Sequence, residues 1–200
     1  MAKLPPFGIE KPLPISINSP QLESINTSGE YVSQLKLDEH RAFYIIENHM
    51  LTVLGWRGNV LHTEKTDLPD MTLDGGILKT KTFKARPIFY VFDYLLDGKG
   101  QKNRLTYIER YNLLKSVLAD APNFFIPDNL DIGVIQEFRN LEQKKSKMVE
   151  RFAEISGSSV QTVYEITEGF VIKRKDGKLL YRPADKSYGP NQLKLKIAGK

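Results

Sequence analysis

The sequence contains no cysteine among its 200 residues. This absence excludes a thiol nucleophile, a thiolate metal site and a disulfide framework, and it suits a reducing cytosol. The three histidines, His40, His49 and His62, are scattered without the spacing of metal ligands. A Walker loop, a Rossmann glycine pattern and a serine-centred nucleophile elbow are also absent. These absences exclude the thiol, P-loop and serine hydrolase classes of enzyme.

Long apolar runs are absent too. No stretch approaches the 18 or so apolar residues that a membrane span requires, and residues 1–6 lack the apolar region of a secretory signal. We therefore expect a soluble, unexported protein of the cytoplasm of a bacterium or a virus-infected cell, with no membrane partner. A chain of 22.8 kDa is long enough to bury a substantial core.

The net charge of +5 is distributed unevenly along the chain. Residues 1–169 hold 20 Lys and Arg against 22 Asp and Glu, a balance of −2, whereas residues 170–200 hold nine against two, a balance of +7. All of the basic surplus therefore lies near the end of the sequence. Such a bias indicates a polyanion partner, nucleic acid or a nucleotide phosphate, although a solubilising tail has the same charge count.

The first half of the chain has the patterns of strands. Residues 1–33 hold five of the 11 prolines and predict an extended lead-in with one short helix around residues 21–25. Three alternating, β-rich stretches with short polar breaks then predict an antiparallel meander, and a continuous apolar run predicts a buried strand that ends at the turn pair Asp97-Gly98. These four strands are expected at residues 31–37, 42–46, 50–54 and 87–92.

The second half mixes helices and strands. Apolar side chains spaced by three and four predict an amphipathic helix over residues 104–119, capped by Thr106, and a highly charged helix is expected over residues 132–156. Residues 169–181 predict two strands around a 175–178 hairpin. Residues 192–197 predict a last strand with lysines on one face and apolar side chains on the other. The fold class is α+β, with mostly antiparallel sheets and flanking helices.

Six short elements follow one another in a fixed order between residues 34 and 196. Together they resemble the signature of the covalent nucleotidyltransferases, the superfamily of ATP-dependent DNA ligases, RNA ligases and mRNA capping enzymes. The family forms are Lys-x-Asp-Gly-x-Arg, Ser-Arg-Asn-Gly, Leu-Asp-Gly-Glu, Phe-Asp-x-Leu-Tyr, Glu-Gly-x-Val-x-Lys and Lys-x-Lys. The corresponding stretches here are residues 36–41, 55–59, 73–76, 91–98, 168–173 and 192–196.

The resemblance implies the nucleotidyltransferase, or adenylation, domain of an ATP-dependent DNA ligase, with an ATP-grasp-like fold over residues 31–200. Relatives continue into an OB-fold domain, and we expect none within these residues because the sequence ends four residues after Lys196. The implied reaction adenylates a lysine, transfers AMP to a 5′-phosphate at a nick and joins it to a 3′-hydroxyl, as in DNA repair and replication. ATP, Mg²⁺ and nicked duplex DNA are the expected cofactors and partner, RNA is the alternative substrate, and we expect a monomer.

The resemblance also assigns roles to single residues. Lys36 is the expected nucleophile, since an amine in a partly desolvated pocket among other cations is readily freed of its proton. The catalytic set further includes two lysines that neutralise the phosphates, and Glu168 is the expected ligand of Mg²⁺. The two lysines of the catalytic set are Lys194 and Lys196. The nucleotide is expected to contact Arg41 and Arg57 through its ribose and phosphate oxygens, and Phe92 through its adenine ring. Gln34 is expected at the adenine edge, and Lys173 is a further expected contact of the nucleotide.

Each assignment has a plainer alternative. Lys36 alone would be a surface lysine whose stem packs on a strand. The two arginines would be solvated turn charges, and Phe92 would be core, because at least two rings in residues 88–92 must be buried. Glu168 and the later lysines would form a solvated surface. The Lys-x-Lys spacing, however, places both ammonium groups on one face of a strand, which favours a directed site.

The sequence departs from the family pattern at two positions. Glu39 stands where the signature has Gly, and Gly76 stands where it has the Glu that the family uses on the ribose hydroxyls. Asp74 or Glu39 is a candidate replacement for that carboxylate. The departures keep three alternatives open: an RNA ligase, a capping-type guanylyltransferase, and a catalytically impaired relative that binds nucleic acid.

Overall fold

The chain divides into two compact units that interleave along the sequence. In a computed structural model, the described residues are 8–9, 11–16, 19–77, 89–97, 104–130, 132, 150, 153–154, 159, 167–179, 181–182 and 188–196. Unit 1 comprises Met1–Gly8 and Glu39–Ile126, and unit 2 comprises Ile9–Asp38 and Pro127–Lys200. The boundary at Asp38 and Glu39 lies inside the first signature element.

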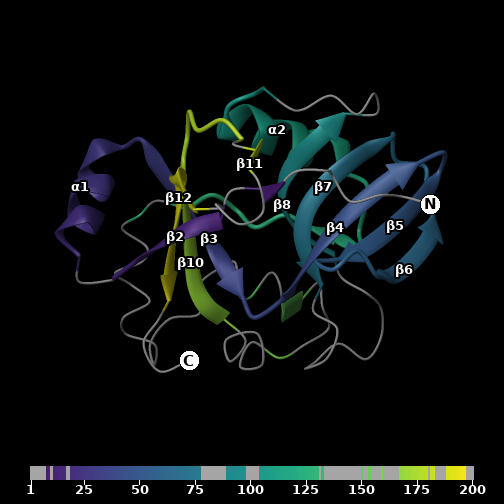
Figure 1. Cartoon of the computed structure of the whole chain (residues 1–200), viewed down its shortest axis with the longest axis horizontal. Coiled ribbons are helices and arrows are strands. Elements are labelled where there is room, and N and C mark those ends of the chain that lie inside the picture. Colours follow the sequence, from purple (N-terminus) through teal and green to yellow (C-terminus); the bar gives the residue numbers. More distant parts are fainter. Residues whose placement is uncertain are drawn as a thin grey trace. The chain divides into compact units, whose positions relative to one another are not determined.

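Among the described residues, unit 1 contains a six-stranded sheet (Figure 1). Neighbouring strands are antiparallel, except that β8 and β9 are parallel. One face of the sheet forms a core with the helix α2 (Tyr107–Val117), in which Tyr44, Leu73, Val91 and Leu114 are fully buried. The strand order is β6 (Val60–Lys65), β5 (Met50–Gly55), β4 (His40–Glu47), β7 (Met71–Ile77), β8 (Phe89–Asp97) and β9 (Phe124–Phe125).

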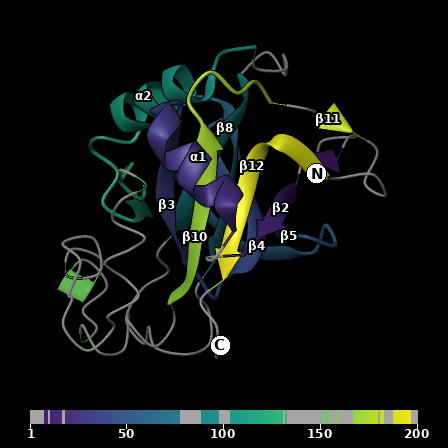
Figure 2. The same ribbon diagram turned by 90° about the vertical axis from the view of Figure 1, so that its left-hand side faces the viewer.

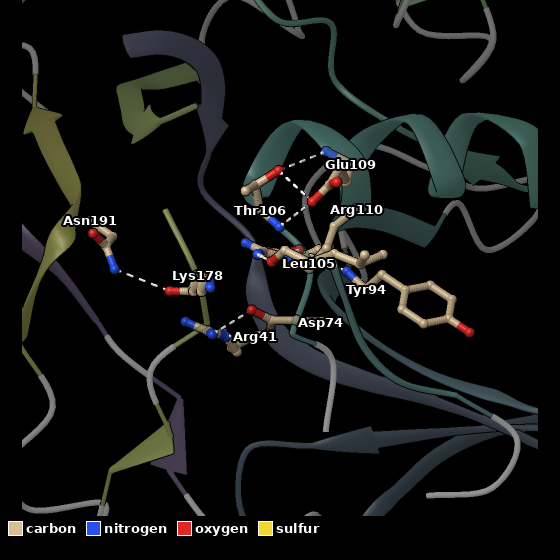
Figure 3. A network of polar contacts seen from close by, with 10 residues as sticks. Arg41, Asp74, Tyr94, Leu105, Thr106, Glu109, Arg110, Lys178 and Asn191 are labelled. Atoms are coloured by element: carbon tan, nitrogen blue, oxygen red, sulfur yellow. Dashed lines mark hydrogen bonds and ion pairs between the residues drawn. The ribbon is translucent and has the colours of Figure 1, made fainter. Parts of the chain in front are cut away.

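The helix α2 begins as the sequence predicts. The Thr106 hydroxyl accepts a hydrogen bond from the Glu109 backbone, and the Glu109 carboxylate accepts one from the Thr106 backbone at 2.7 Å, which completes a capping box (Figure 3). One turn on, Arg110 forms a two-pronged ion pair with Asp93 of β8, with N–O distances of 2.6 and 3.0 Å. Both side chains are nearly fully buried, so this pair attaches the helix to the sheet.

Unit 2 is built on a four-stranded sheet within its described residues. The strand β12 is antiparallel to β10 and parallel to β2, and β10 is antiparallel to β3. The helix α1 (Pro20–Ser28), capped by Ser19, lies against β3 (Figure 2). The strand order is β2 (Lys11–Ile15), β12 (Tyr188–Lys196), β10 (Thr167–Arg174) and β3 (Tyr31–Leu37), and β1 (Gly8–Ile9) pairs with β11 (Tyr181–Arg182) in a small sheet.

The individual elements agree with the sequence patterns better than their pairings do. The predicted three-stranded meander is wrong, because β3 pairs with β10 while β4 and β5 pair in the other sheet. The predicted hairpin after residue 174 is also wrong, since β11 pairs with β1. The predicted extended lead-in, residues 1–33, includes the strand β2, which the sequence did not indicate because of its prolines. Most of the charged helix predicted over residues 132–156 lies outside the described residues, as do Gly98 and Ile197.

The described residues are mostly β-strand, in mixed sheets, with α1 and α2 as their helices. Neither of these helices has the length and apolar character needed to cross a membrane. The boundaries at residues 1–33 and 31–200, and the expectation that no OB-fold lies within this sequence, stay predictions.

Candidate functional site

The sheet of unit 2 gathers the predicted lysines on one face. Cross-strand neighbours point to the same side of a sheet. On β10, Gly169 lies opposite Lys36 on one side and Lys196 on the other, and Val171 lies opposite Gln34 and Lys194. Lys173 follows two residues later on the same side. We call this surface the lysine face; it carries Gln34, Lys36, Lys173, Lys194 and Lys196.

The opposite face of the same strands is apolar and buried. Leu35 is 1% exposed, Phe170 and Leu195 are fully buried, and Leu193 is 3% exposed. The alternation of β12 therefore confirms the predicted division between lysines and leucines. Since the apolar side chains fix which side of each strand faces inward, the lysine face follows from the hydrophobic pattern.

A β-bulge brings Glu168 to the lysine face. Thr167 lies opposite Leu37 and Gly169 lies opposite Lys36, so Glu168 is an extra residue in the pairing of β10 with β3. Gly169 has a φ of +144°, and a Cβ there would overlap the Leu195 carbonyl oxygen. Only glycine fits that backbone. The Glu-Gly sequence therefore redirects the glutamate that strict alternation would send to the buried face.

Two ammonium groups share the Glu168 carboxylate. Lys36 Nζ lies 2.5 Å from Glu168 Oε2, and Lys196 Nζ lies 3.5 Å from the same oxygen. The Lys36 ammonium also donates to the Leu37 carbonyl at 3.3 Å. The side chains of Lys36 and Glu168 are 20% and 21% exposed, against 54% for Lys196. Lys36 is thus held in one orientation yet stays accessible.

Two other predicted residues of the lysine face are deeply buried. Gln34 is 2% exposed, and its Nε2 donates to the Pro127 carbonyl at 3.0 Å, so its amide fixes the segment that follows unit 1 in the sequence. Lys173 is 3% exposed. A lysine is almost never buried so completely unless it is paired. Lys194 is half-buried beside them.

In unit 1, the predicted Arg41 is held by Asp74. Arg41 Nε and one terminal nitrogen lie 2.7 and 2.5 Å from the two carboxylate oxygens (Figure 3). The Trp56 ring lies 5.8 Å from the guanidinium carbon. Arg57 is exposed on the turn between β5 and β6. Arg41 is therefore fixed in place, whereas Arg57 projects from a turn.

Phe92 lies at a second bulge. Asp74 is opposite Asp93 and Gly75 is opposite Val91, so Phe92 is the extra residue in the pairing of β7 with β8. Its ring is half-buried and packs edge-on against Tyr90 at 5.0 Å between centroids. Residues 89–91 are buried, so Phe92 is the most exposed ring of this apolar run.

Two features of unit 1 were not anticipated as part of a site. The Asp93 carboxylate is committed to Arg110, and Arg110 Nη1 also donates to the Leu105 carbonyl at 2.7 Å. The sequence contained two signals for this pair: Asp93 lies inside the fourth signature element, and Arg110 lies in the second turn of the predicted helix. Tyr44 donates to the Gly76 carbonyl at 2.5 Å, and burial, followed by the charges of Asp74 and Glu39, raises the pKa of Tyr44 well above its usual value.

The lysine face suits a single Mg²⁺ ligand rather than a complete metal centre. Among the described residues there is no group of three or more His, Cys, Asp and Glu side chains placed to hold a metal. Glu168 is the one carboxylate that β3, β10 and β12 contain. Mg²⁺ is commonly held by one or two carboxylates, waters and substrate phosphates, so Glu168 fits that role and the phosphates would complete the shell.

No family model and no curated protein matches this sequence. Solved structures do match. A Lig E DNA ligase superimposes with a TM-score of 0.55 at 16% identity, over 94% of this chain and 69% of that one. The ligase domain of M. tuberculosis LigD gives 0.53 at 16% identity, over 92% and 59%. This chain has the fold of a DNA ligase nucleotidyltransferase domain.

A mycobacterial DNA ligase D complexed with ATP and MES has the same fold, with a TM-score of 0.50 and 18% identity over 84% of this chain. The chain spans only 55% of that structure and 59% of the M. tuberculosis ligase domain. The resemblance that the six elements indicate is thus confirmed at the level of the fold.

Proposed function

We propose that this chain is the nucleotidyltransferase domain of an ATP-dependent DNA ligase, with Lys36 as the residue that becomes adenylated. The observation that carries the proposal is the 2.5 Å contact between Lys36 Nζ and Glu168 on a face with three further lysines. A partly buried lysine that is oriented by a carboxylate able to accept its proton is placed to act as an amine nucleophile.

The first stage is attack of the Lys36 amine on the α-phosphorus of ATP. A bond forms between Nζ and phosphorus, the bond to the bridging oxygen breaks, and pyrophosphate leaves. Nζ must lose a proton, and Glu168 is the carboxylate within hydrogen-bond reach of it. Mg²⁺ bound at Glu168 would supply positive charge to the phosphate oxygens.

The other lysines stabilise the charge that builds on the phosphates. Lys194 and Lys196 lie on the same side of β12 and flank Lys36 across β10. Fixed ammonium groups near a leaving pyrophosphate stabilise the transition state without reorganising at the moment of reaction. In unit 1, Arg41, Arg57 and Phe92 are proposed to contact the nucleotide as the resemblance implies.

The later stages transfer AMP to a 5′-phosphate and release it when a 3′-hydroxyl attacks. DNA is favoured by the Lig E and LigD likenesses and by the Glu-Gly-Phe-Val-Ile-Lys form of residues 168–173. Arg110 favours neither substrate, because its side chain is 2% exposed and paired with Asp93. The basic surplus of residues 170–200 suits either nucleic acid.

The test is covalent labelling. The protein is incubated with Mg²⁺ and α-labelled ATP, α-labelled GTP or γ-labelled ATP, and label on the denatured protein is counted. We expect label from α-labelled ATP alone. Label from GTP would favour a capping-type guanylyltransferase, and no label from any nucleotide would favour an impaired nucleic-acid-binding relative. Sealing of nicked DNA against nicked RNA then decides between the ligase classes.

A further inference from the structure

The sheet that carries the lysine face ends, among the described strands, at β2 on one side and at β3 on the other. A strand at the end of a sheet points part of its backbone N–H and C=O groups away from its partner, and these groups can pair with a strand of another molecule. Native proteins block such edges with prolines, charged side chains or a covering segment of their own chain. The two edges of this sheet differ in which of these they use.

The edge at β3 is covered by the chain itself. The backbones of Ser33 and Leu130 exchange two hydrogen bonds, at 2.9 and 2.8 Å, and the Ser33 hydroxyl also donates to the Leu130 carbonyl at 3.2 Å. The Gln34 amide donates to the Pro127 carbonyl at 3.0 Å. Residues 127–130 thus occupy the outward side of β3 at Ser33, where an added strand would have to pair.

The edge at β2 contains prolines at its outward positions. Strand β2 runs parallel to β12 (Figure 2), with Leu13 opposite Leu193 and Pro14 opposite Lys194. The backbone groups of alternate residues point toward the partner strand, and a proline on an edge strand takes a position whose N–H would face outward. Leu13 therefore bonds to β12, while Pro12 and Pro14 point outward. Since proline has no N–H, these two positions present carbonyl acceptors and no donor.

We propose that Pro12 and Pro14 close this edge of the unit 2 sheet and keep two copies of the chain from pairing through β2. Leu13 is 42% exposed, so an apolar side chain lies at the same edge, and apolar edge strands are liable to join edge to edge. Each proline removes one hydrogen bond that an added strand would need. This role involves no nucleotide and goes beyond the proposed function.

The experiment restores the two missing donors. A double variant, Pro12→Thr with Pro14→Thr, is compared with the wild type and with Pro20→Thr, whose proline is exposed at the start of α1; threonine is a residue that strands favour. Sedimentation velocity is measured without nucleotide over a wide range of protein concentration. We expect the mass of the double variant alone to rise with concentration, from 22.8 kDa toward twice that value. A double variant whose mass follows that of the wild type at every concentration would overturn the proposal.

A further variant locates the contact. Adding Leu13→Lys to the double variant places a charge on the edge strand, which disfavours strand addition, and should return the mass toward that of the wild type. All masses are measured well below the melting temperature of each chain, and the rise should reverse on dilution, because folded chains then pair and separate. Association that Leu13→Lys does not weaken, or a mass that stays high after dilution, would contradict pairing through β2.

Discussion

The two units use charge in opposite ways. On the sheet of unit 1, two arginines are each matched by an aspartate in a two-pronged pair, Arg41 with Asp74 and Arg110 with Asp93. On the described lysine face of unit 2, Lys36 and Lys196 share the carboxylate of Glu168, the one carboxylate that β3, β10 and β12 contain. Paired charges hold a structure, whereas a surplus of one sign attracts a ligand of the other. The contrast supports the proposal that the lysine face of unit 2 contacts the phosphates of the nucleotide.

The two units also differ in which basic residue they use: the charge pairs of unit 1 contain arginine, and the lysine face of unit 2 contains lysine. The planar guanidinium has a fork that fits one carboxylate in one geometry, which suits a fixed internal contact. A lysine ammonium is a compact charge on a flexible stem, and it can lose its proton to become a nucleophile. Arginine in the buried pair with Asp93 therefore suits a structural role, and lysine beside Glu168 suits the proposed reactive role.

The largest effect is expected where unit 1 buries charge. Arg110→Met leaves Asp93 charged and buried without its arginine, which should lower the free energy of unfolding by about 3–5 kcal/mol. Urea denaturation measures this, with Arg104→Ala, exposed just before α2, as the control. Equal stability of Arg110→Met and the control would mean that the buried pair does not hold the helix.

In unit 2, the loss of Glu168 should affect chemistry instead of stability. Glu168→Ala should slow labelling by at least about 10-fold while nucleotide binding stays measurable, because the carboxylate orients Lys36 and is proposed to hold the metal. Raising Mg²⁺ should restore part of the rate if metal binding is the deficit. Labelling at the wild-type rate in low Mg²⁺ would contradict this role.

Salt dependence sharpens the contrast between the two units for DNA binding. The logarithm of the affinity for a nicked duplex should fall with the logarithm of salt concentration by about 0.9 per phosphate contact. Lys194→Ala and Lys196→Ala should each reduce that slope by about one contact, and Lys65→Ala, at the end of β6 in unit 1, should leave it unchanged. A slope near zero in the wild type would assign the basic surplus to solubility or to the nucleotide alone.

The smallest effect concerns Tyr44. Its raised pKa means that the unfolded chain ionises at lower pH than the folded one, so stability is complete below about pH 10 and falls as pH rises above it. Tyr44→Phe removes the ionisable group and should flatten this fall by up to about 1.4 kcal/mol per pH unit. Thermal unfolding between pH 9 and 11 measures it. Parallel curves for the two proteins would rule out a contribution from Tyr44.

The sequence predicts local features well because they depend on neighbouring residues. The Thr106 cap, the short helix around residues 21–25, which the structure extends to Pro20–Ser28, and the alternation of Lys194 and Lys196 with leucines all follow from short-range spacing. Strand pairing does not, since β3 finds its partner β10 more than a hundred residues away and Asp38-Glu39 leads into another sheet instead of a hairpin.

The candidate site likewise has features that the sequence predicts and features that it does not. The six elements indicate which residues matter, and the hydrophobic alternation predicts that Lys36, Lys194 and Lys196 share a face once the register is known. The bulge that turns Glu168 toward Lys36 depends on Gly169 meeting the Leu195 carbonyl. The packing of Glu39 over Gly76 likewise joins positions 37 residues apart. Such contacts between distant residues have no signal in a single sequence.

The most direct test of the account is to locate the adenylated residue. After incubation with ATP and Mg²⁺, the protein is digested and the AMP-bearing peptide is sequenced by mass spectrometry. Lys178→Ala serves as the control, because Lys178 is exposed and its described hydrogen bond is accepted by its backbone carbonyl. We predict one modified peptide containing Lys36, retained in Lys178→Ala and lost in Lys36→Ala with no change in melting temperature. AMP on another residue, or labelling that persists in Lys36→Ala, would contradict the central claim.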